Sequence, residues 1–450
     1  GDMTGIFSMD DDDADLSMKL EKKLDLNYRL VDENGISTID EDDINDTVSE
    51  LPRPIPVKNT RRNSIPSTVK SSSYEIDIHE SYVSSLNNTN SFKNYKPKLS
   101  DFEPIKVLGR GAYGKVILVR EISTNRLFAQ KQLKKASLVI NETNEIHQVN
   151  YNRTINEKSI LEMVNHPNIV SLYYAFQDND KVYLILEYLS GGELFHHLAQ
   201  EKFMSEKNAA YYIAQIILAL RYLHNKLGVI YRDLKPENCM LNSYGNLVLT
   251  DFGLSKVSTT DEKKHSMTGT VQYMAPEILK NEPYTYSVDW WSLGCVAYDL
   301  LTGSPPFNGN NNKKIMEKII SSKKTLKFPF YLTLDAKDLL RRLLQPNPEK
   351  RFNIDNDFDS LKKHRFFRHI DWSQMESPEY QLETLPPILP IITDPILAEN
   401  FDEEFTEMSF TPPANVSGKM HNAGVSNQPD ILHIKDFTFT NDSYLSSIFN

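Results

Sequence analysis

The chain has 450 residues, of which 40% are hydrophobic, and its formal net charge at pH 7 is −11. This size allows a large buried core, and we expect one two-lobed globular unit with extensions. Sixteen acidic and four basic residues lie in the first 50 positions, so the acidity belongs to the N-terminal segment. No stripe of clustered Lys and Arg is present, which disfavours nucleic acid as a partner.

Cysteine content and the length of apolar runs indicate the compartment of the chain and whether it could span a membrane. Cys239 and Cys295 are the only cysteines, and both lie in apolar segments where we expect inert buried thiols in a reducing compartment. No signal-peptide pattern opens the chain, and no apolar run reaches the roughly 18 residues that span a bilayer. We therefore expect a monomer without a membrane span, in the cytoplasm or, as the alternative, in the nucleus.

The predicted elements change character along the chain. Residues 1–97 are rich in Asp, Asn, Ser and Lys, and this composition predicts disorder. Short β-rich runs then predict a small antiparallel sheet, a helical pattern follows, and two more strands complete this part. The predicted strands are 105–108, 116–119, 127–133, 172–176 and 182–187, and the predicted helix is 148–164.

Beyond Gly191 and Gly192 the apolar residues recur at helical spacing. Strands first and helices afterwards indicate an α+β fold. After about residue 367 the pattern becomes a Pro-rich extended segment, 385–395, and then a polar tail. The predicted helices of this second part are 209–227, 287–302, 313–320 and 334–344.

The most informative stretch is Tyr231-Arg-Asp-Leu-Lys-Pro-Glu-Asn238, followed by Asp251-Phe-Gly253. Phosphoryl transfer needs metal ligands, a cation for the phosphate and a carboxylate that orients the acceptor. In the motif set known for such enzymes, Asp233 would orient the acceptor hydroxyl and Lys235 would contact the γ-phosphate. Asn238 and Asp251 supply the oxygen ligands that suit Mg²⁺.

A glycine-rich turn lies upstream and predicts a nucleotide loop at Gly109, Gly111, Ala112 and Gly114. Lys131 on the next predicted strand would contact the α- and β-phosphates of ATP, and Glu157 would hold its amine in an ion pair. The same glycine spacing occurs in dinucleotide-binding folds, but those need a βαβ unit and an acid about 20 residues on. A lysine on a strand instead favours interpreting the four motifs together as those of a protein kinase.

Four apolar residues are predicted to wall an adenine pocket, and two backbone positions to hydrogen-bond the ring. Ordinary core packing explains the same apolar pattern equally well, so both interpretations stay open at this stage. The walls are Leu108, Val116, Ala129 and Met240, and the backbone positions are Glu187 and Leu189.

Residues 102–367 resemble the eukaryotic protein kinase domain, including Ala275-Pro-Glu277 and Asp289-Trp-Trp-Ser-Leu-Gly294. The resemblance implies a bilobal fold, with a β-rich small lobe at 102–186 and a helical large lobe at 190–367, and ATP and Mg²⁺ as cofactors. It also implies a buried pair between Glu277 and Arg351, and a catalytic loop anchored by Asp289. Lys235-Pro-Glu-Asn238 and Gly269-Thr270 resemble serine/threonine kinases, which makes Thr270 a substrate-binding position.

Tyr231 and the tail resemble the AGC group, nearest to its TOR-regulated ribosomal protein kinases and their fungal relatives. In the implied regulatory tail, 368–450, Phe401-Asp-Glu-Glu-Phe405 is similar to a tether across the nucleotide cleft. Phe410-Thr-Pro-Pro413 is similar to the turn motif, and Phe437-Thr-Phe439 to the hydrophobic motif that docks on the small lobe. Another AGC subfamily, such as the fungal membrane-stress or cyclic-nucleotide-linked kinases, is the alternative.

The resemblance also implies regulatory sites and partners. The activation-loop phosphosite is Ser266, with Thr268 as a rival, and its kinase is the phosphoinositide-dependent kinase. Phe7-Ser-Met-Asp-Asp11 resembles a TOR-signalling motif, which predicts the TOR complex as a partner. The other predicted phosphosites are Thr411, Thr438 and Ser64, the last in the basic stretch Arg61-Arg-Asn-Ser64.

Three acids resemble the positions with which AGC kinases receive substrate arginines: Glu193, Glu237 and Asp299. Carboxylates suit planar guanidinium groups, so we expect Ser/Thr protein substrates with basic residues before the acceptor. A pseudokinase scaffold and a small-metabolite phosphotransferase are the alternatives. The intact Lys131 and Asp233 disfavour the first, and the Ala-Pro-Glu segment disfavours the second.

Overall fold

A computed structural model of the chain describes residues 96–111, 114–135, 145–199, 201–251, 256–257, 271–409, 434 and 437–449. The predicted disorder over residues 1–97 falls almost wholly outside this part. The described residues form two compact units. We call residues 96–197, 239–251 and 376–449 the strand unit, and residues 198–238 and 256–375 the helical unit.

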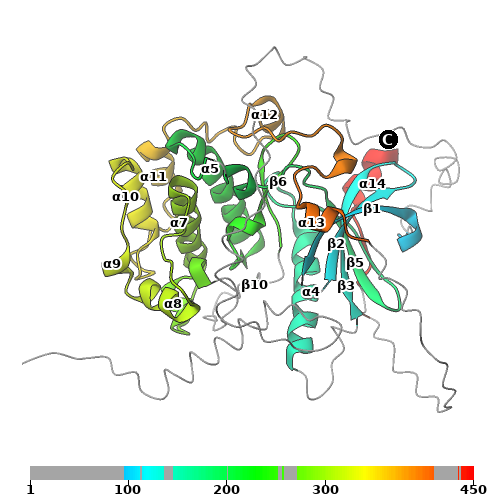
Figure 1. Cartoon of the computed structure of the whole chain (residues 1–450), viewed down its shortest axis with the longest axis horizontal. Helices are drawn as coiled ribbons and strands as arrows, with labels where there is room; N and C mark the ends of the chain where they lie inside the picture. Colours follow the sequence, from blue (N-terminus) through cyan, green and yellow to red (C-terminus); the bar gives the residue numbers. More distant parts are fainter. Residues whose placement is uncertain are drawn as a thin grey trace, which may run out of the picture. The chain divides into compact units, whose positions relative to one another are not determined.

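An antiparallel six-stranded sheet forms most of the strand unit (Figure 1). Its order is β1-β2-β3-β5-β4-β11, and helix α4 (Glu145–Met163) contacts it at β4. The predicted antiparallel sheet and its five strands are confirmed. The strands are β1 (Phe102–Gly111), β2 (Gly114–Glu121), β3 (Leu127–Lys134), β4 (Leu172–Gln177), β5 (Lys181–Glu187) and β11 (Phe439–Thr440).

Two apolar clusters form the core around this sheet. One is rich in aromatic rings, among them Phe102, Phe128 and Tyr174, and the other contains Leu108, Leu118 and Ala129. Such residues favour strands because rings and branched chains pack well across neighbouring strands. Each cluster also contains residues after position 375: Tyr444 and Leu445 in the first, and Ala398 in the second. This C-terminal tail therefore contributes to the core of the strand unit.

A second, three-stranded sheet in the strand unit consists of β6 (Gly192–Glu193), β8 (Cys239–Leu241) and β9 (Leu247–Leu249). Gly192 has a φ of +68°, and a Cβ there would lie 2.2 Å from the Asn400 carbonyl oxygen. Glycine is therefore required where the tail crosses this turn. Cys239 is fully buried, as predicted.

The helical unit contains the predicted helices. Its longest members, α5 and α7, are buried along nearly their whole length, and Trp290 and Trp291 lie at their core. The last five residues of the predicted helix 209–227 form the π-helical turn η5 (Leu223–Leu227). The helices are α5 (Glu206–Tyr222), α6 (Pro276–Leu279), α7 (Ser287–Thr302), α8 (Asn312–Ile320), α9 (Ser322–Thr325), α10 (Leu334–Leu343) and α11 (Phe358–Lys362), with a two-stranded sheet of β7 (Val229–Ile230) and β10 (Lys256–Val257).

Residues 437–449, in the tail where no regular pattern was found, contain elements that the sequence did not predict. This stretch forms β11 and helix α14 (Asp442–Phe449), and α12 (Pro378–Glu383) and α13 (Glu403–Thr406) precede it. Among the side chains that the structure describes, Tyr444, Leu445 and Ile448 form the apolar face of α14, which is too short a pattern to detect as a helix. Among the described residues, no helix is both long and apolar enough to cross a bilayer.

Candidate active site

The catalytic loop lies in the helical unit between β7 and the 3₁₀ turn η6 (Pro236–Asn238). The Asn238 side-chain amide donates to the carbonyl oxygen of Asp233 at 2.8 Å and to its carboxylate at 2.9 Å. The Lys235 amine lies 3.4 Å from the other carboxylate oxygen. The structure thus brings three of the predicted residues together and fixes the direction of the Asp233 carboxylate.

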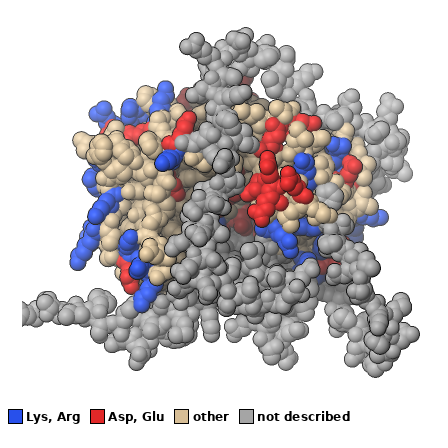
Figure 2. All heavy atoms as spheres, viewed as in Figure 1, with Lys and Arg blue, Asp and Glu red and all other residues tan. Residues whose placement is uncertain are grey.

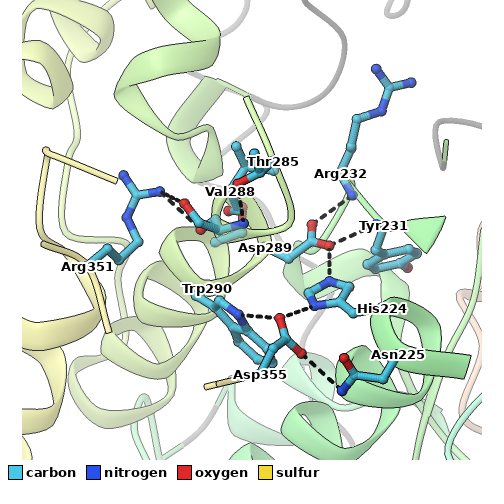
Figure 3. A network of polar contacts seen from close by, with 12 residues as sticks. His224, Asn225, Tyr231, Arg232, Thr285, Val288, Asp289, Trp290, Arg351 and Asp355 are labelled. Atoms are coloured by element: carbon cyan, nitrogen blue, oxygen red, sulfur yellow. Dashed lines mark hydrogen bonds and ion pairs between the residues drawn. The ribbon is translucent and has the colours of Figure 1, made fainter. Parts of the chain in front are cut away.

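Asp289 anchors this loop from α7, as predicted (Figure 3). Its carboxylate accepts hydrogen bonds from the backbone N–H groups of Tyr231, at 2.8 Å, and Arg232, at 2.9 Å. Arg232 has a φ of +65°, a conformation that costs a non-glycine residue about 1–3 kcal/mol unless its surroundings hold it. Two hydrogen bonds to one buried carboxylate hold it here.

A buried histidine extends this anchor (Figure 3). His224 in η5 lies 2.7 Å from the Asp289 carboxylate and 2.8 Å from that of Asp355, which also accepts from the Trp290 indole. Burial lowers the pKa of His224, but the hydrogen bonds and charges of the two carboxylates outweigh it and raise the pKa to about 9. His224 is therefore an imidazolium at neutral pH. Sequence reasoning missed this residue.

On the strand unit, Lys131 and Glu157 form a close ion pair between β3 and α4. The Lys131 amine lies 3.0 and 2.8 Å from the two Glu157 carboxylate oxygens. The Asp251 carboxylate is 4.0 Å from the same amine and 46% exposed. These three side chains therefore lie together, with the Asp251 carboxylate open to solvent.

The predicted adenine walls Leu108, Val116 and Ala129 belong to one apolar cluster. The tail joins this cluster, because Phe401 stacks on Tyr188 with ring centroids 6.0 Å apart. Tyr188 also donates its phenol hydrogen to the Pro395 carbonyl at 2.9 Å. Met240, the fourth predicted wall, is not part of this cluster and lies half-buried on strand β8 of the three-stranded sheet.

Some backbone groups of Glu187 and Leu189, the two positions predicted to bind the adenine ring, already form hydrogen bonds within the chain. The N–H of Glu187 donates to Ser171 at 2.9 Å, and the carbonyl of Leu189 accepts from Gly192 at 3.1 Å. These two bonds do not involve the Glu187 carbonyl or the Leu189 N–H, which are the groups that the predicted adenine contact would use.

The glycine-rich turn joins β1 and β2. Gly111 pairs with Gly114, and a Cβ on Gly114 would lie 1.8 Å from the Gln132 carbonyl oxygen. A Cβ on Gly109 would meet nothing within 4 Å. Steric need therefore explains Gly114 but not Gly109. Ala112 lies outside the described residues.

The acids predicted to receive substrate arginines are divided between the units. Asp299, in the helical unit, accepts from the Tyr273 phenol at 2.9 Å. Burial and the charge of Glu237 raise the pKa of Asp299 to about 6, and the hydrogen bond from Tyr273 opposes this shift. Glu237 is exposed, and Glu193 is exposed on β6 in the strand unit.

Arg351 and Glu277 form the predicted buried pair in the helical unit. The two terminal nitrogens of Arg351 lie 2.6 and 3.0 Å from the two Glu277 carboxylate oxygens. The remaining predicted sites, Thr270 and the phosphosites Ser266, Thr411 and Ser64, lie outside the described residues. Thr438 is described and is exposed.

Comparison with known proteins decides the family. Residues 102–367 match the family described as "Protein kinase domain", and residues 392–439 match "Protein kinase C terminal domain". The chain belongs to the protein kinases, in the AGC serine/threonine group. The enzyme class predicted from the motifs, an ATP-dependent protein-serine/threonine kinase, is thereby confirmed.

Several curated relatives are similar in sequence. Serine/threonine-protein kinase YPK3 of Saccharomyces cerevisiae is 43% identical over 404 residues, which are 78% of this chain and 76% of that protein. Ribosomal protein S6 kinase 2 alpha of Gallus gallus is 43% identical over 337 residues, 73% of this chain but only 43% of that protein. The RAC family serine/threonine-protein kinase homolog of Dictyostelium discoideum is 42% identical over 317 residues, which cover 70% of this chain and 68% of that protein.

Proposed function

We propose that this kinase transfers the γ-phosphate of ATP to Ser or Thr hydroxyls of proteins that carry arginines before the acceptor. The observation that supports catalysis most directly is the ion pair of Lys131 with Glu157, together with an Asp233 carboxylate oriented by Asn238. A scaffold that only binds would need neither feature. The pseudokinase alternative is therefore disfavoured by geometry as well as by residue type.

Each residue has a role in this proposal. Lys131 holds the α- and β-phosphates, Asp233 accepts the hydrogen bond of the acceptor hydroxyl, and Lys235 neutralises charge on the transferred phosphoryl group. Glu157 is a positioning residue, because it acts on Lys131 and not on the nucleotide.

The residues available for Mg²⁺ fit that ion. The amide nitrogen of Asn238 donates to Asp233, so its amide oxygen points away from Asp233. Asp251 presents a partly exposed carboxylate. Both are the hard oxygen donors that Mg²⁺ prefers. When bound, the ion would neutralise phosphate charge.

The preference for basic substrates rests on Glu237 and Asp299. Their mutual repulsion and the burial of Asp299 make an arriving guanidinium favourable, since it offsets both costs. Figure 2 shows a further acidic patch at α13 on the strand unit, formed by Asp402, Glu403, Glu404 and Glu407, which would attract basic partners at longer range.

The test is phosphate transfer from Mg·ATP to an arginine-containing Ser peptide by the full chain. We expect Asp233→Asn and Asp251→Ala to reduce the rate at least a hundredfold while their unfolding midpoints stay close to the parent's. Measurable transfer that neither substitution affects would contradict the assigned roles. Transfer to metabolites with none to peptides would favour the metabolite alternative.

We also propose TOR-linked regulation, supported by the similarity to relatives named as ribosomal protein S6 kinases. In this proposal, TOR complex binds the segment Phe7-Ser-Met-Asp-Asp11 and phosphorylates Thr438. The phosphoinositide-dependent kinase phosphorylates Ser266, and the protein acts in the cytoplasm. Phosphorylation of Thr438 that persists unchanged in cells carrying Phe7→Ala would contradict the TOR step.

A further inference from the structure

The end of the chain carries a side-chain cluster that the catalytic proposal does not use. Glu121 at the end of β2 is 1% exposed, and its carboxylate accepts three hydroxyl hydrogens. Two come from the part of the strand unit before residue 198, Thr124 at 2.6 Å and Tyr174 at 2.7 Å. The third comes from Tyr444 in α14, at 2.7 Å. The tail thus completes the hydrogen bonding of a buried carboxylate.

A half-buried arginine, Arg126, contacts the ring of the same tyrosine. The Arg126 guanidinium carbon is 4.9 Å from the centre of the Tyr444 ring, 4.6 Å from that of Tyr173 and 5.2 Å from that of Phe128. Its terminal nitrogen also donates to the Tyr173 phenol at 2.9 Å. Cation–π contacts strengthen when water is excluded, so α14 gains from covering a charge that is already in place.

Asn441 fixes α14 to the sheet. Its backbone N–H donates to the Tyr173 carbonyl at 2.9 Å, and its side-chain amide donates to the Leu172 carbonyl at 3.1 Å. Its side-chain oxygen accepts from the Tyr444 N–H at 3.1 Å, which caps the first turn of α14. One residue therefore both starts the helix and binds it to β4.

The segment before Asn441 connects α14 to the neighbourhood of the Lys131–Glu157 ion pair. Directly before Asn441, β11 pairs with β4 through Phe439 and Thr440. Before β11, Phe437 is 1% exposed, and the Lys158 amine of α4 lies 5.6 Å from its ring centre. Lys158 is the immediate neighbour of Glu157, which holds Lys131.

The other docked residue is Ile434, whose N–H donates to the Gln177 side chain at 3.0 Å and whose carbonyl accepts from it at 2.7 Å. These two residues thus contribute two hydrogen bonds and two buried apolar side chains, since Ile434 is itself 2% exposed. Because α14 adds a capped helix, a charged hydrogen bond and a cation–π contact, it supplies a large share of the attachment of this segment.

We propose that Tyr444 is a positioning residue of the kinase, which holds β11 and Phe437 on the strand unit and thereby keeps Glu157 engaged with Lys131. This inference rests on the proposed roles of Lys131 and Glu157. Loss of a hydrogen bond to a charged group shifts an equilibrium by roughly tenfold to a hundredfold, so removal of Tyr444 should release a substantial fraction of the tail.

The experiment uses the full chain with Tyr444→Ala, the conservative Tyr444→Phe, and Ser443→Ala on the exposed side of α14 as the matched control. Hydrogen exchange at residues 437–449 reports attachment, and steady-state kinetics with an arginine-containing peptide report activity below the unfolding temperature. We expect faster exchange and a kcat lowered about tenfold for Tyr444→Ala, with peptide KM unchanged. Tyr444→Phe should be intermediate because it keeps the ring over Arg126, and Ser443→Ala should match the parent.

Three results would overturn the proposal. Unchanged exchange in Tyr444→Ala would mean that Tyr444 does not hold the tail. Faster exchange with an unchanged kcat would mean that the tail does not position Glu157. A fall in kcat that disappears at lower temperature, in step with the unfolding midpoint, would show that the residue only stabilises the fold. Since exchange is measured without substrate, failure of the catalytic proposal would leave the attachment result readable.

Discussion

Two buried carboxylates, one in each unit, organise the functional parts of this kinase in different ways. Asp289 in the helical unit accepts two backbone N–H groups of the catalytic loop and contacts His224, which lies 65 positions away in sequence. Glu121 in the strand unit accepts three hydroxyl groups, one of them from Tyr444, which is 323 positions away. Each network lies within its own unit, but the second includes a residue of the C-terminal tail and is complete only when that tail is attached.

The catalytic loop is therefore held whenever its unit is folded, which we call permanent order, whereas the Glu121 region is held fully only when the tail is attached, which we call conditional order. A charge network whose members all lie within the core has no partner to lose, so it fixes the catalytic loop whenever the unit is folded. A carboxylate that receives one of its donors from a distant segment makes the local structure depend on that segment. The kinase therefore combines a constant catalytic loop with a strand unit that depends on the tail.

The largest expected effect comes from breaking the permanent network. Asp289→Ala removes the partner of two backbone N–H groups and leaves the His224 imidazolium with one carboxylate fewer in the core. Loss of one member of a buried ion pair costs about 3–5 kcal/mol, and we expect that drop in the free energy of unfolding. Denaturant titration of the full chain measures this drop in the free energy of unfolding.

The matched control is Asp359→Ala, which removes an exposed i,i+3 partner of Lys362. Exposed pairs contribute little, so the unfolding free energy of this variant should match the parent's within the error of the titration. Equal losses in both variants would mean that the buried network carries no special weight.

The same network predicts a pH dependence of stability. The folded pKa of His224, about 9, lies above its ordinary value of 6.5 because of Asp289 and Asp355. This stabilisation is complete below pH 6.5 and is lost as the pH rises through 9, and a shift of this size corresponds to about 3 kcal/mol. The unfolding free energy should therefore fall between pH 6.5 and 9.5, and Asp355→Asn should flatten that slope. An identical slope in the variant would contradict the assignment.

The sequence predicted the local chemistry better than the attachments. Lys131, Asp233 and Asn238 stand in short motifs whose spacing follows from the needs of phosphoryl transfer, and the strands around them have clear apolar patterns. His224 and Asp355 lie 131 positions apart with no shared motif, so their contact could not be predicted. Helix α14 escaped notice because its few apolar residues form a face only when the sheet of another segment is present.

A smaller effect concerns substrate binding by the helical unit. Because the pKa of Asp299 is raised to about 6, mainly by burial, this acid is ionised at pH 7.5 and largely protonated at pH 5. Only the ionised form attracts a guanidinium, so KM for an arginine-containing peptide should rise roughly tenfold across this range. A peptide without upstream arginine should show no such rise. Persistence of the full pH effect in Asp299→Asn would assign it to another group.

The smallest expected effect tests the conditional part of the molecule at the nucleotide walls. Tyr188→Phe removes the hydrogen bond to the Pro395 carbonyl but keeps the ring that stacks on Phe401. A neutral hydrogen bond contributes about 1 kcal/mol, so KM for ATP should rise by no more than about fivefold while KM for the peptide stays constant. Tyr331→Phe, on an exposed loop of the helical unit, is the matched control and should leave both constants unchanged. A rise in the peptide KM alone would mean that this tail segment acts on the protein substrate and not on the nucleotide.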